Sequence, residues 1–235
     1  MRSRSQYLRE MGLTPWTLIT DTRVIANQHV EPASNDLKSP GKVPPSGWTL
    51  LQQQVGICTR CNLHTTRKTT VFGEGNPKAN WLLVGEAPGA EEDRQGLPFV
   101  GRAGQLLNRM LFSVDLARDD VFVANVLKCR PPDNRDPFGE EVSACESFLH
   151  QQVKFIQPKI ILAMGRFAAQ ALLRTDQTIG QLRGRIHRYP AYDIPLVVTY
   201  HPAYLLRSPQ AKAKAWADLI LALAESERVA GSENV

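Results

Sequence analysis

Four cysteines carry the most distinctive spacing in the chain. Cys58 and Cys61 form a C-x2-C pair, and Cys129 and Cys145 follow after 67 and 15 intervening residues. Cysteine thiolates bind zinc or an iron–sulfur cluster, and structural disulfides are not expected in a reducing compartment. The spacing alone leaves three interpretations open: a zinc site, an iron–sulfur cluster, or four unrelated buried thiols.

A second set of chemically capable residues stands directly behind four short apolar runs. The segment GEAPGAEEDRQGLPFVGRAG follows the first run, Asn125 the second, Gly165 the third, and Tyr200, His201 and Pro202 the fourth. Parallel strands end at one sheet edge, where the N-termini of the following helices present free N–H groups. We therefore expect these glycines, carboxylates, amide and imidazole to gather in one polar cleft.

The glycine-rich segment does not match the common phosphate-binding loops. It is neither G-x-G-x-x-G nor a Walker A sequence, because no G-K-[ST] follows the glycines. An ATPase is therefore disfavoured. A serine nucleophile is also unsupported, since the chain contains no G-x-S-x-G motif.

The elements that must position the cleft alternate along the chain. The apolar runs are residues 81–84, 121–124, 160–164 and 196–199, short and rich in branched side chains as buried parallel strands are. A helical pattern follows each run, at residues 105–114, 140–155, 166–173 and 208–225. This alternation predicts an α/β fold with helices on both faces of a parallel sheet.

The remaining segments differ in composition from this α/β domain, which we place at residues 48–225. Residues 5–19 form a short amphipathic pattern within an N-terminal docking peptide, residues 1–26. Residues 27–47 are rich in Pro and Ser and predict a flexible linker. Residues 226–235 are expected to be a disordered tail.

The overall composition limits which classes of protein and which kinds of binding partner are possible. Of the 235 residues, 43 % are hydrophobic and 22 % charged, which excludes a wholly disordered or fibrous chain. The formal net charge of +5 favours a polyanionic partner such as nucleic acid. No apolar run approaches the roughly 20 residues that span a bilayer, and the first residues lack a signal-peptide pattern, so we expect a cytoplasmic protein with no membrane partner.

Four segments, in this order, resemble the family 4 uracil-DNA glycosylases, the iron–sulfur branch of the uracil glycosylases. They are GICTRCNLHTTRKTTVFGEGNP, GEAPGAEEDRQGLPFVGRAGQLL, NVLKCRPPDNRDP and HPAYLLR, and the resemblance covers about residues 48–225. It implies a three-layer α/β/α sandwich around a central, mainly parallel four-stranded sheet. It also implies removal of uracil from single- or double-stranded DNA without backbone cleavage, and a structural [4Fe–4S] cluster held by Cys58, Cys61, Cys129 and Cys145.

The resemblance suggests a role for each residue of the expected cleft. Phe99 would stack on the flipped base, and the amide of Asn125 would accept from uracil N3–H and donate to O4. His201 would donate to uracil O2 and stabilise the negative charge of the leaving base. Glu86 would position water, with Glu92 in support, although a helix N-terminal carboxylate is an equal interpretation of Glu92.

Further residues would complete the DNA contacts. Main-chain N–H groups from Gly85 to Gly89 would add to charge stabilisation, Leu205 would wedge into the vacated base stack, and Arg207 would contact phosphate. Many relatives have HPSALLR at the second motif, so Ala203 lacks a hydroxyl and affinity or turnover is expected to be lower.

Three basic residues near the cysteines, Lys128, Arg130 and Arg135, either touch the DNA backbone or belong to a solvated surface. The basic insertion ending in His that marks the uracil-crosslinking relatives is absent after Asn125. The sequence therefore predicts turnover rather than covalent attachment.

The N-terminal segment YLREMGLTPWTL lies outside the glycosylase pattern and resembles the clamp-loader-binding peptide of the psi subunit of bacterial DNA polymerase III. This resemblance implies a glycosylase tethered to clamp-loader subunits through residues 5–19. The alternative is a non-catalytic psi-like accessory subunit built on a glycosylase fold. Glu86, Phe99, Asn125 and His201 are all present, which favours the enzyme.

Overall fold

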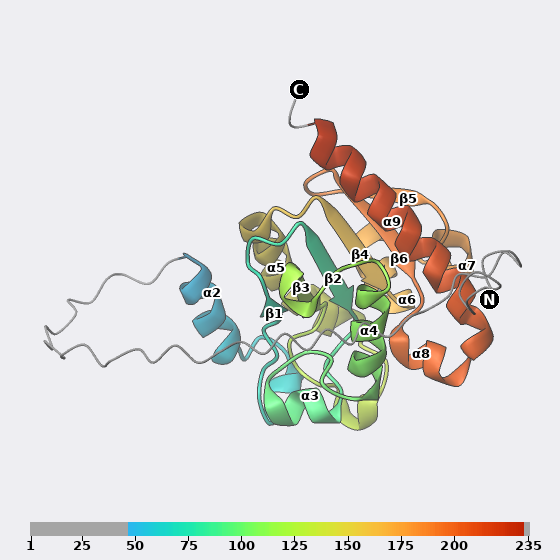
Figure 1. Ribbon diagram of the computed structural model, residues 1–235. Coiled ribbons are helices and arrows are strands. Elements are labelled where there is room, and N and C mark those ends of the chain that lie inside the picture. The colour runs from blue at the N-terminus through green and yellow to red at the C-terminus, as the bar shows by residue number, and fades with distance from the viewer. Residues whose placement is uncertain (1–46, 233–235) are drawn as a thin grey trace, which may run out of the picture. The chain divides into compact units, whose positions relative to one another are not determined.

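One six-stranded sheet organises the protein, whose computed structural model describes residues 47–232 (Figure 1). The strand order is β1-β3-β2-β4-β6-β5. The strands are β1 (Glu74–Gly75), β2 (Trp81–Gly85), β3 (Val121–Asn125), β4 (Ile160–Met164), β5 (Ile186–Tyr189) and β6 (Ile194–Thr199). The four central strands are parallel, and β1 and β5 pair antiparallel at the two edges.

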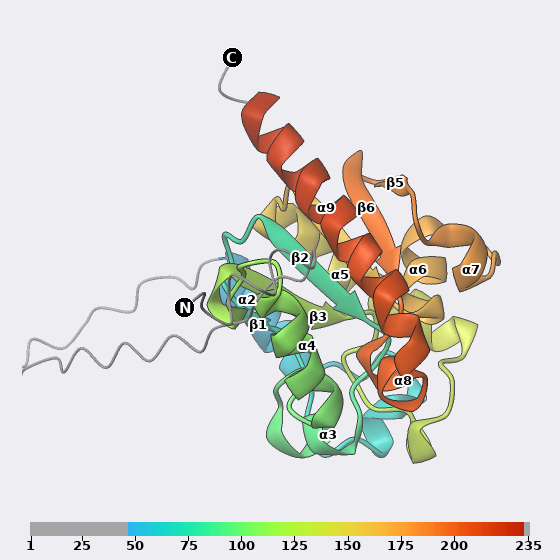
Figure 2. The same ribbon diagram turned by 45° about the vertical axis from the view of Figure 1, so that its right-hand side comes forward.

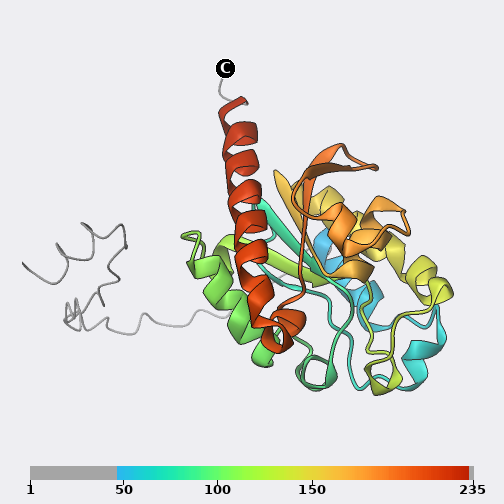
Figure 3. The ribbon, with the colours of Figure 1, turned by 90° about the vertical axis from the view of Figure 1, so that its right-hand side faces the viewer.

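Helices cover both faces of this sheet. They are α2 (Gly47–Gly56), α3 (Ala90–Gln95), α4 (Arg102–Phe112), α5 (Gly139–Ile156), α6 (Arg166–Leu173), α7 (Ile179–Leu182), α8 (Pro202–Arg207) and α9 (Lys212–Ser232). Figure 3 shows α9 and α4 on one side of the sheet and α6 on the other. The expected three-layer α/β/α sandwich with a parallel four-stranded centre is confirmed.

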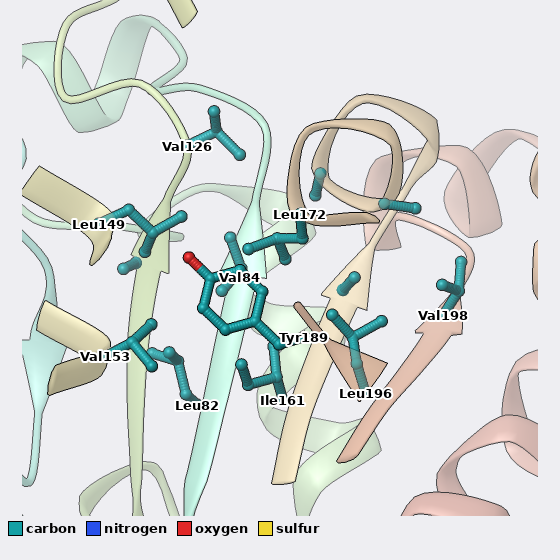
Figure 4. Packing of buried hydrophobic residues seen from close by; sticks show 14 of the residues in the cluster. Leu82, Val84, Val126, Leu149, Val153, Ile161, Leu172, Tyr189, Leu196 and Val198 are labelled. Atoms are coloured by element: carbon teal, nitrogen blue, oxygen red, sulfur yellow. The ribbon is translucent and has the colours of Figure 1, made fainter. Parts of the chain in front are cut away.

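The alternation of side chains along each strand produces two cores. On β2, Leu82 and Val84 face α5 and α6, whereas Trp81 and Leu83 face α4 and α9. Figure 4 shows the first core, in which Leu82, Val84, Ile161, Leu196 and Val198 of the sheet meet Leu149, Val153 and Leu172 of the helices. Because both faces are buried, the central strands are continuous apolar runs.

The sheet directs its carboxyl edge toward one set of loops. In Figure 2 the arrow of β2 points to the end of the molecule where α3 and α8 lie. The segments that follow β2, β3 and β6 therefore converge there, and they contain the polar residues expected to form the cleft.

Some expected boundaries are wrong. The edge strands β1 and β5 were not expected, and helix α9 continues to Ser232, so the expected disordered tail from residue 226 is corrected. A bidentate ion pair between Arg228 and Glu225, three residues apart, stabilises this last part of α9. The expected docking peptide and residues 27–46 of the expected linker lie outside the described residues, and Gly47, expected as the end of the linker, begins α2. Across residues 47–232, every helix is too short or too polar to span a bilayer.

Candidate functional site

A cavity of about 400 Å³ opens at the carboxyl edge of the sheet. It brings together seven of the residues expected in the cleft: Glu86, Gly89, Glu92, Phe99, Asn125, His201 and Arg207. Glu86 and Gly89 come from the loop after β2, Glu92 from α3, and Phe99 from the loop between α3 and α4. Asn125 ends β3, His201 is the N-cap of α8, and Arg207 is the last residue of α8. The spatial convergence inferred from strand ends is therefore observed.

Asn125 stands at the end of β3, opposite Gly85 in the parallel register. Its side chain lines the cavity, although the residue is only 2 % exposed. Within the described part of the protein, its buried Oδ1 has no hydrogen-bond partner. An unpaired buried acceptor costs about 1–3 kcal/mol, which a donor supplied by a ligand would recover.

Phe99 adopts a left-handed backbone conformation, with φ at 54°. The chain folds back tightly here, because a Cβ on Gly104 in the first turns of α4 would lie 1.6 Å from the Phe99 carbonyl oxygen. The Phe99 ring lies 5.4 Å from the His201 ring, between centroids, and the planes are tilted by 30°. An aromatic residue held this way, against its usual conformational preference, indicates a fixed stacking surface in the cavity wall.

Gly85 does not line the cavity and lies behind it. A Cβ at this position would stand 2.4 Å from Asn125 Oδ1 and 2.8 Å from the nearest Phe99 ring atom. The missing side chain therefore leaves room for both cavity residues. The expected direct contact of Gly85 with substrate is replaced by this supporting position, while Gly89, at the N-terminus of α3, does line the cavity.

His201 caps the N-terminus of α8. Its Nδ1 accepts a hydrogen bond of 3.1 Å from the Ala203 main-chain N–H. Burial, and to a lesser degree the charge of Arg207, lower the pKa of His201 to about 4. The imidazole is therefore neutral near pH 7, and with Nδ1 accepting, its proton is on Nε2. It is a neutral donor.

Glu86 is half-buried in the cavity wall. Burial, and after it the exposed carboxylate of Asp136, raise its pKa to about 7, with Arg166 opposing the shift. A carboxyl group with a pKa near 7 exchanges protons at neutral pH, as a group that positions or deprotonates water must. Asp136 was not expected in the cleft from the sequence, yet it lines the same cavity.

Glu92 belongs to the first turn of α3 and holds the following loop. Its Oε1 accepts from the main-chain N–H groups of Val100 at 3.0 Å and Gly101 at 3.3 Å. Gly101 is the N-cap of α4, so this carboxylate occupies a helix N-terminus. Glu92 thereby fixes the segment that carries Phe99.

Helix α8 presents its side chains differently from the expectation. Leu205 is 1 % exposed and packs in the core between α4 and α9, so it cannot serve as a wedge without unpacking that core. Tyr204 is 39 % exposed, lines the cavity and stacks on Tyr200 at 5.0 Å between ring centroids. The wedge assignment of Leu205 is therefore corrected. Arg207 is exposed at the cavity rim, as a phosphate contact requires.

The three basic residues near the cysteines have separate environments. Arg135 forms an ion pair with the buried carboxylate of Glu141, and Arg130 donates to Asn134 at 2.9 Å. Lys128 is 1 % exposed, so the expectation that it touches DNA or solvent is wrong. Nothing in the sequence around Lys128 predicts that this side chain is buried.

The four cysteines line one small pocket together with Arg67 and Lys128. Arg67 donates to the Cys129 sulfur at 3.0 Å, and burial raises the pKa of Cys145 to about 11. Among residues 47–232, no three His, Cys, Asp or Glu side chains are arranged to hold a single metal ion. Four thiols with basic neighbours around one pocket fit the ligands that an iron–sulfur cluster would need, since the cations would balance the charge of the thiolates.

Comparisons with known proteins agree with this arrangement. The family model of the uracil DNA glycosylase superfamily matches residues 72–220. A type-4 uracil-DNA glycosylase of Archaeoglobus fulgidus is 44 % identical over 164 residues, covering 67 % of this chain and 82 % of that protein. Its counterpart in Pyrobaculum aerophilum is 43 % identical over 177 residues, covering 73 % and 90 %. That of Thermotoga maritima is 42 % identical over 160 residues, covering 68 % and 83 %.

Proposed function

We propose that the cavity of this chain binds one uracil rotated out of DNA. The premise is that the chain belongs to the uracil DNA glycosylase superfamily and, within it, to the type-4 uracil-DNA glycosylases. The chain is a monofunctional uracil-DNA glycosylase, which hydrolyses the N-glycosidic bond of deoxyuridine. This membership decides against the non-catalytic accessory subunit. The assignment of individual residues to steps of the reaction is our proposal.

The observation that carries the proposal is the unpaired acceptor of Asn125 in the cavity wall. A small rotation of the amide turns Oδ1 to uracil N3–H and the NH₂ group to O4. Cytosine has an acceptor at N3 and a donor at position 4, so both pairings fail. Each mispaired buried group costs about 1–3 kcal/mol, which excludes the normal base.

His201 and Glu86 act on the two halves of the transition state. The neutral Nε2–H of His201 donates to uracil O2 and stabilises the negative charge that grows on the base as the bond to the sugar breaks. The ionised carboxylate of Glu86 faces the sugar, which develops positive charge, and orients the attacking water. The proton released by that water passes to Glu86.

The remaining cavity residues hold the extruded nucleotide. Phe99 stacks on the uracil ring, with its position fixed by Glu92 and the turn before α4. Tyr204, rather than Leu205, fills the space that the base leaves in the DNA stack. Arg207 neutralises a phosphate beside the flipped nucleotide.

Cys58, Cys61, Cys129 and Cys145 would hold a [4Fe–4S] cluster. The donor set supports this, because four thiols line one pocket beside the three cationic side chains of Arg60, Arg67 and Lys128. When bound, the cluster supplies structural cross-linking rather than chemistry at the base. It would join the loop after α2, the loop after β3 and helix α5.

Release of free uracil tests the proposed site. The full chain is incubated with a single-stranded oligonucleotide that contains one deoxyuridine, and the free base and intact abasic strand are quantified. We expect release by the parent, and loss of at least about 100-fold in rate for Asn125→Ala and His201→Ala. Equal release by either variant and the parent would remove that residue from the site.

We also propose that residues 5–19 dock the enzyme onto a clamp-loader subunit of DNA polymerase III, in the cytoplasm. The sequence of this segment supports the proposal, and it lies outside the described residues. Co-purification with clamp-loader subunits should persist in Asn125→Ala and be lost in Trp16→Ala. Retention by Trp16→Ala would refute the docking role without affecting the glycosylase assignment.

A further inference from the structure

Among residues 47–232, the charged side chain of Lys128 is buried and its hydrogen-bond acceptors carry no charge. It is 1 % exposed and among the largest fully buried side chains of the described residues. Its Nζ donates to the Asn125 main-chain carbonyl at 2.8 Å and to Gln152 Oε1 at 2.7 Å. Both acceptors are neutral. A buried ammonium without a compensating anion costs several kcal/mol, so another source of negative charge is required.

That negative charge can come from the cysteine pocket. Lys128 lines this pocket with the four thiols, and its main chain donates a hydrogen bond to Cys145. Cluster binding requires the cysteines as thiolates, which places anions beside the ammonium. The Lys128 residue therefore lines the cysteine pocket, and its Nζ donates to the Asn125 carbonyl.

The loop between these two points is tightly held. Val126 and Leu127 donate main-chain hydrogen bonds of 3.0 Å to Gly85 and Glu86, at the end of β2. The Lys128 carbonyl accepts from the Val71 N–H at 2.8 Å. The direct link from the Lys128 side chain to Asn125 is therefore the hydrogen bond from Nζ to the Asn125 carbonyl, which closes this loop on itself.

We propose that Lys128 is a positioning residue for uracil recognition, whose ammonium is balanced by the cysteine thiolates of the cluster and fixes the main chain at Asn125. This inference rests on the proposed function. It gives the cysteine pocket a specific consequence for base recognition: binding of the cluster stabilises the cation that holds the recognising amide in place.

The substitution Lys128→Met tests it, because methionine keeps an unbranched apolar chain and removes the charge and donors. Lys154→Met, on the exposed surface of α5, is the matched control. The holoprotein is assayed for iron per chain, for loss of visible absorbance under a chelator, and for KM and kcat on a single-stranded uracil oligonucleotide. We expect Lys128→Met to lose iron about 10- to 100-fold faster and to raise KM about tenfold, with a smaller change in kcat.

The outcomes separate the inference from the proposed function. Iron retention and KM equal to those of Lys154→Met would overturn the inference, and so would faster iron loss with unchanged KM. If the parent holds iron and releases no uracil, the proposed function itself fails.

A second variant covers the case in which Lys128→Met does not fold. Gln152→Glu places a carboxylate at the position that accepts from Nζ, and therefore supplies the missing anion within the protein. Free uracil binding is measured before and after chelation of iron. We expect Gln152→Glu to lose less uracil affinity on iron removal than the parent loses, and equal losses would overturn the inference.

Discussion

Glu86 and His201 face the same cavity, and their pKa values are shifted in opposite directions from the ordinary values of a carboxyl group and an imidazole. Burial raises the pKa of the carboxyl group to about 7 and lowers that of the imidazole to about 4, because in each case it disfavours the charged form. Near pH 7 the pair thus provides one titrating carboxyl group and one permanently neutral donor. Two such environments define separate roles for the two halves of a reaction.

The pH dependence of the rate follows from these shifts. Below a pH of about 7 Glu86 is protonated and cannot stabilise a positive sugar, so the single-turnover rate should fall as pH falls through about 7. His201 stays neutral until about pH 4 and adds no further change above that value. In Glu86→Gln we expect a rate at least about 100-fold lower and without this limb. A parent rate independent of pH between about 5 and 8 would contradict the assignment.

Gly85 offers a test of the packing behind the cavity. In Gly85→Ala the added methyl would overlap Asn125 and Phe99, at 2.4 Å and 2.8 Å from its position. Both must move, so we expect strong loss of uracil release and destabilisation by about 1–3 kcal/mol in denaturant unfolding. Gly180→Ala is the control, because its Cβ would meet only Thr178 at 4.0 Å. Parent-like activity of Gly85→Ala would show that the cavity is not rigid.

Residue identities at the site were predictable where they follow strand ends. Asn125 comes directly after one apolar run and His201 follows another after one residue, and parallel topology then places them together. The burial of Leu205 and Lys128 was not predictable, because both depend on which face of a short segment packs against distant elements. The shifted pKa values are likewise properties of the assembled cavity.

The helices and strands that could be predicted from the sequence are those that are long or continuously apolar. The four central strands were predicted almost to their ends, because burial on both faces makes them continuously apolar. Helices α5 and α6 were predicted from their helical apolar pattern. Strand β1 has two residues, and only one of the four residues of β5 is buried, so neither carries a recognisable pattern. Short helices such as α3 and α7 depend on tertiary contacts more than on propensity.

Helix α8 shows how one element serves both the core and the cavity, and its two faces predict different mutant phenotypes. Leu205→Ala should lower the free energy of unfolding by about 2–5 kcal/mol, since the side chain is fully buried. Tyr204→Ala should leave stability unchanged and raise KM for single-stranded substrate about tenfold, because base stacking on an aromatic ring is worth about 1–3 kcal/mol. Tyr204→Phe should retain the parent KM. Unchanged KM in Tyr204→Ala would exclude the stacking role.

At the scale of the whole molecule, the cysteine pocket joins segments that the sheet alone does not tie together. Cys58 and Cys61 follow α2, Cys129 follows β3, and Cys145 lies in α5. Aerobically purified full-length protein should be brown, with visible thiolate-to-iron absorption, and removal of iron should lower its unfolding midpoint. Colourless protein that contains zinc would contradict the cluster.

The central claim is that one pocket recognises the hydrogen-bonding edge of uracil, and the most direct test is binding of the free base. Uracil and cytosine are titrated separately into the full chain and into Asn125→Ala. We expect the parent to bind uracil at least about 100-fold more tightly than cytosine, and this preference to disappear largely in Asn125→Ala. Equal binding of the two bases by the parent, or an undiminished preference in the variant, would contradict it.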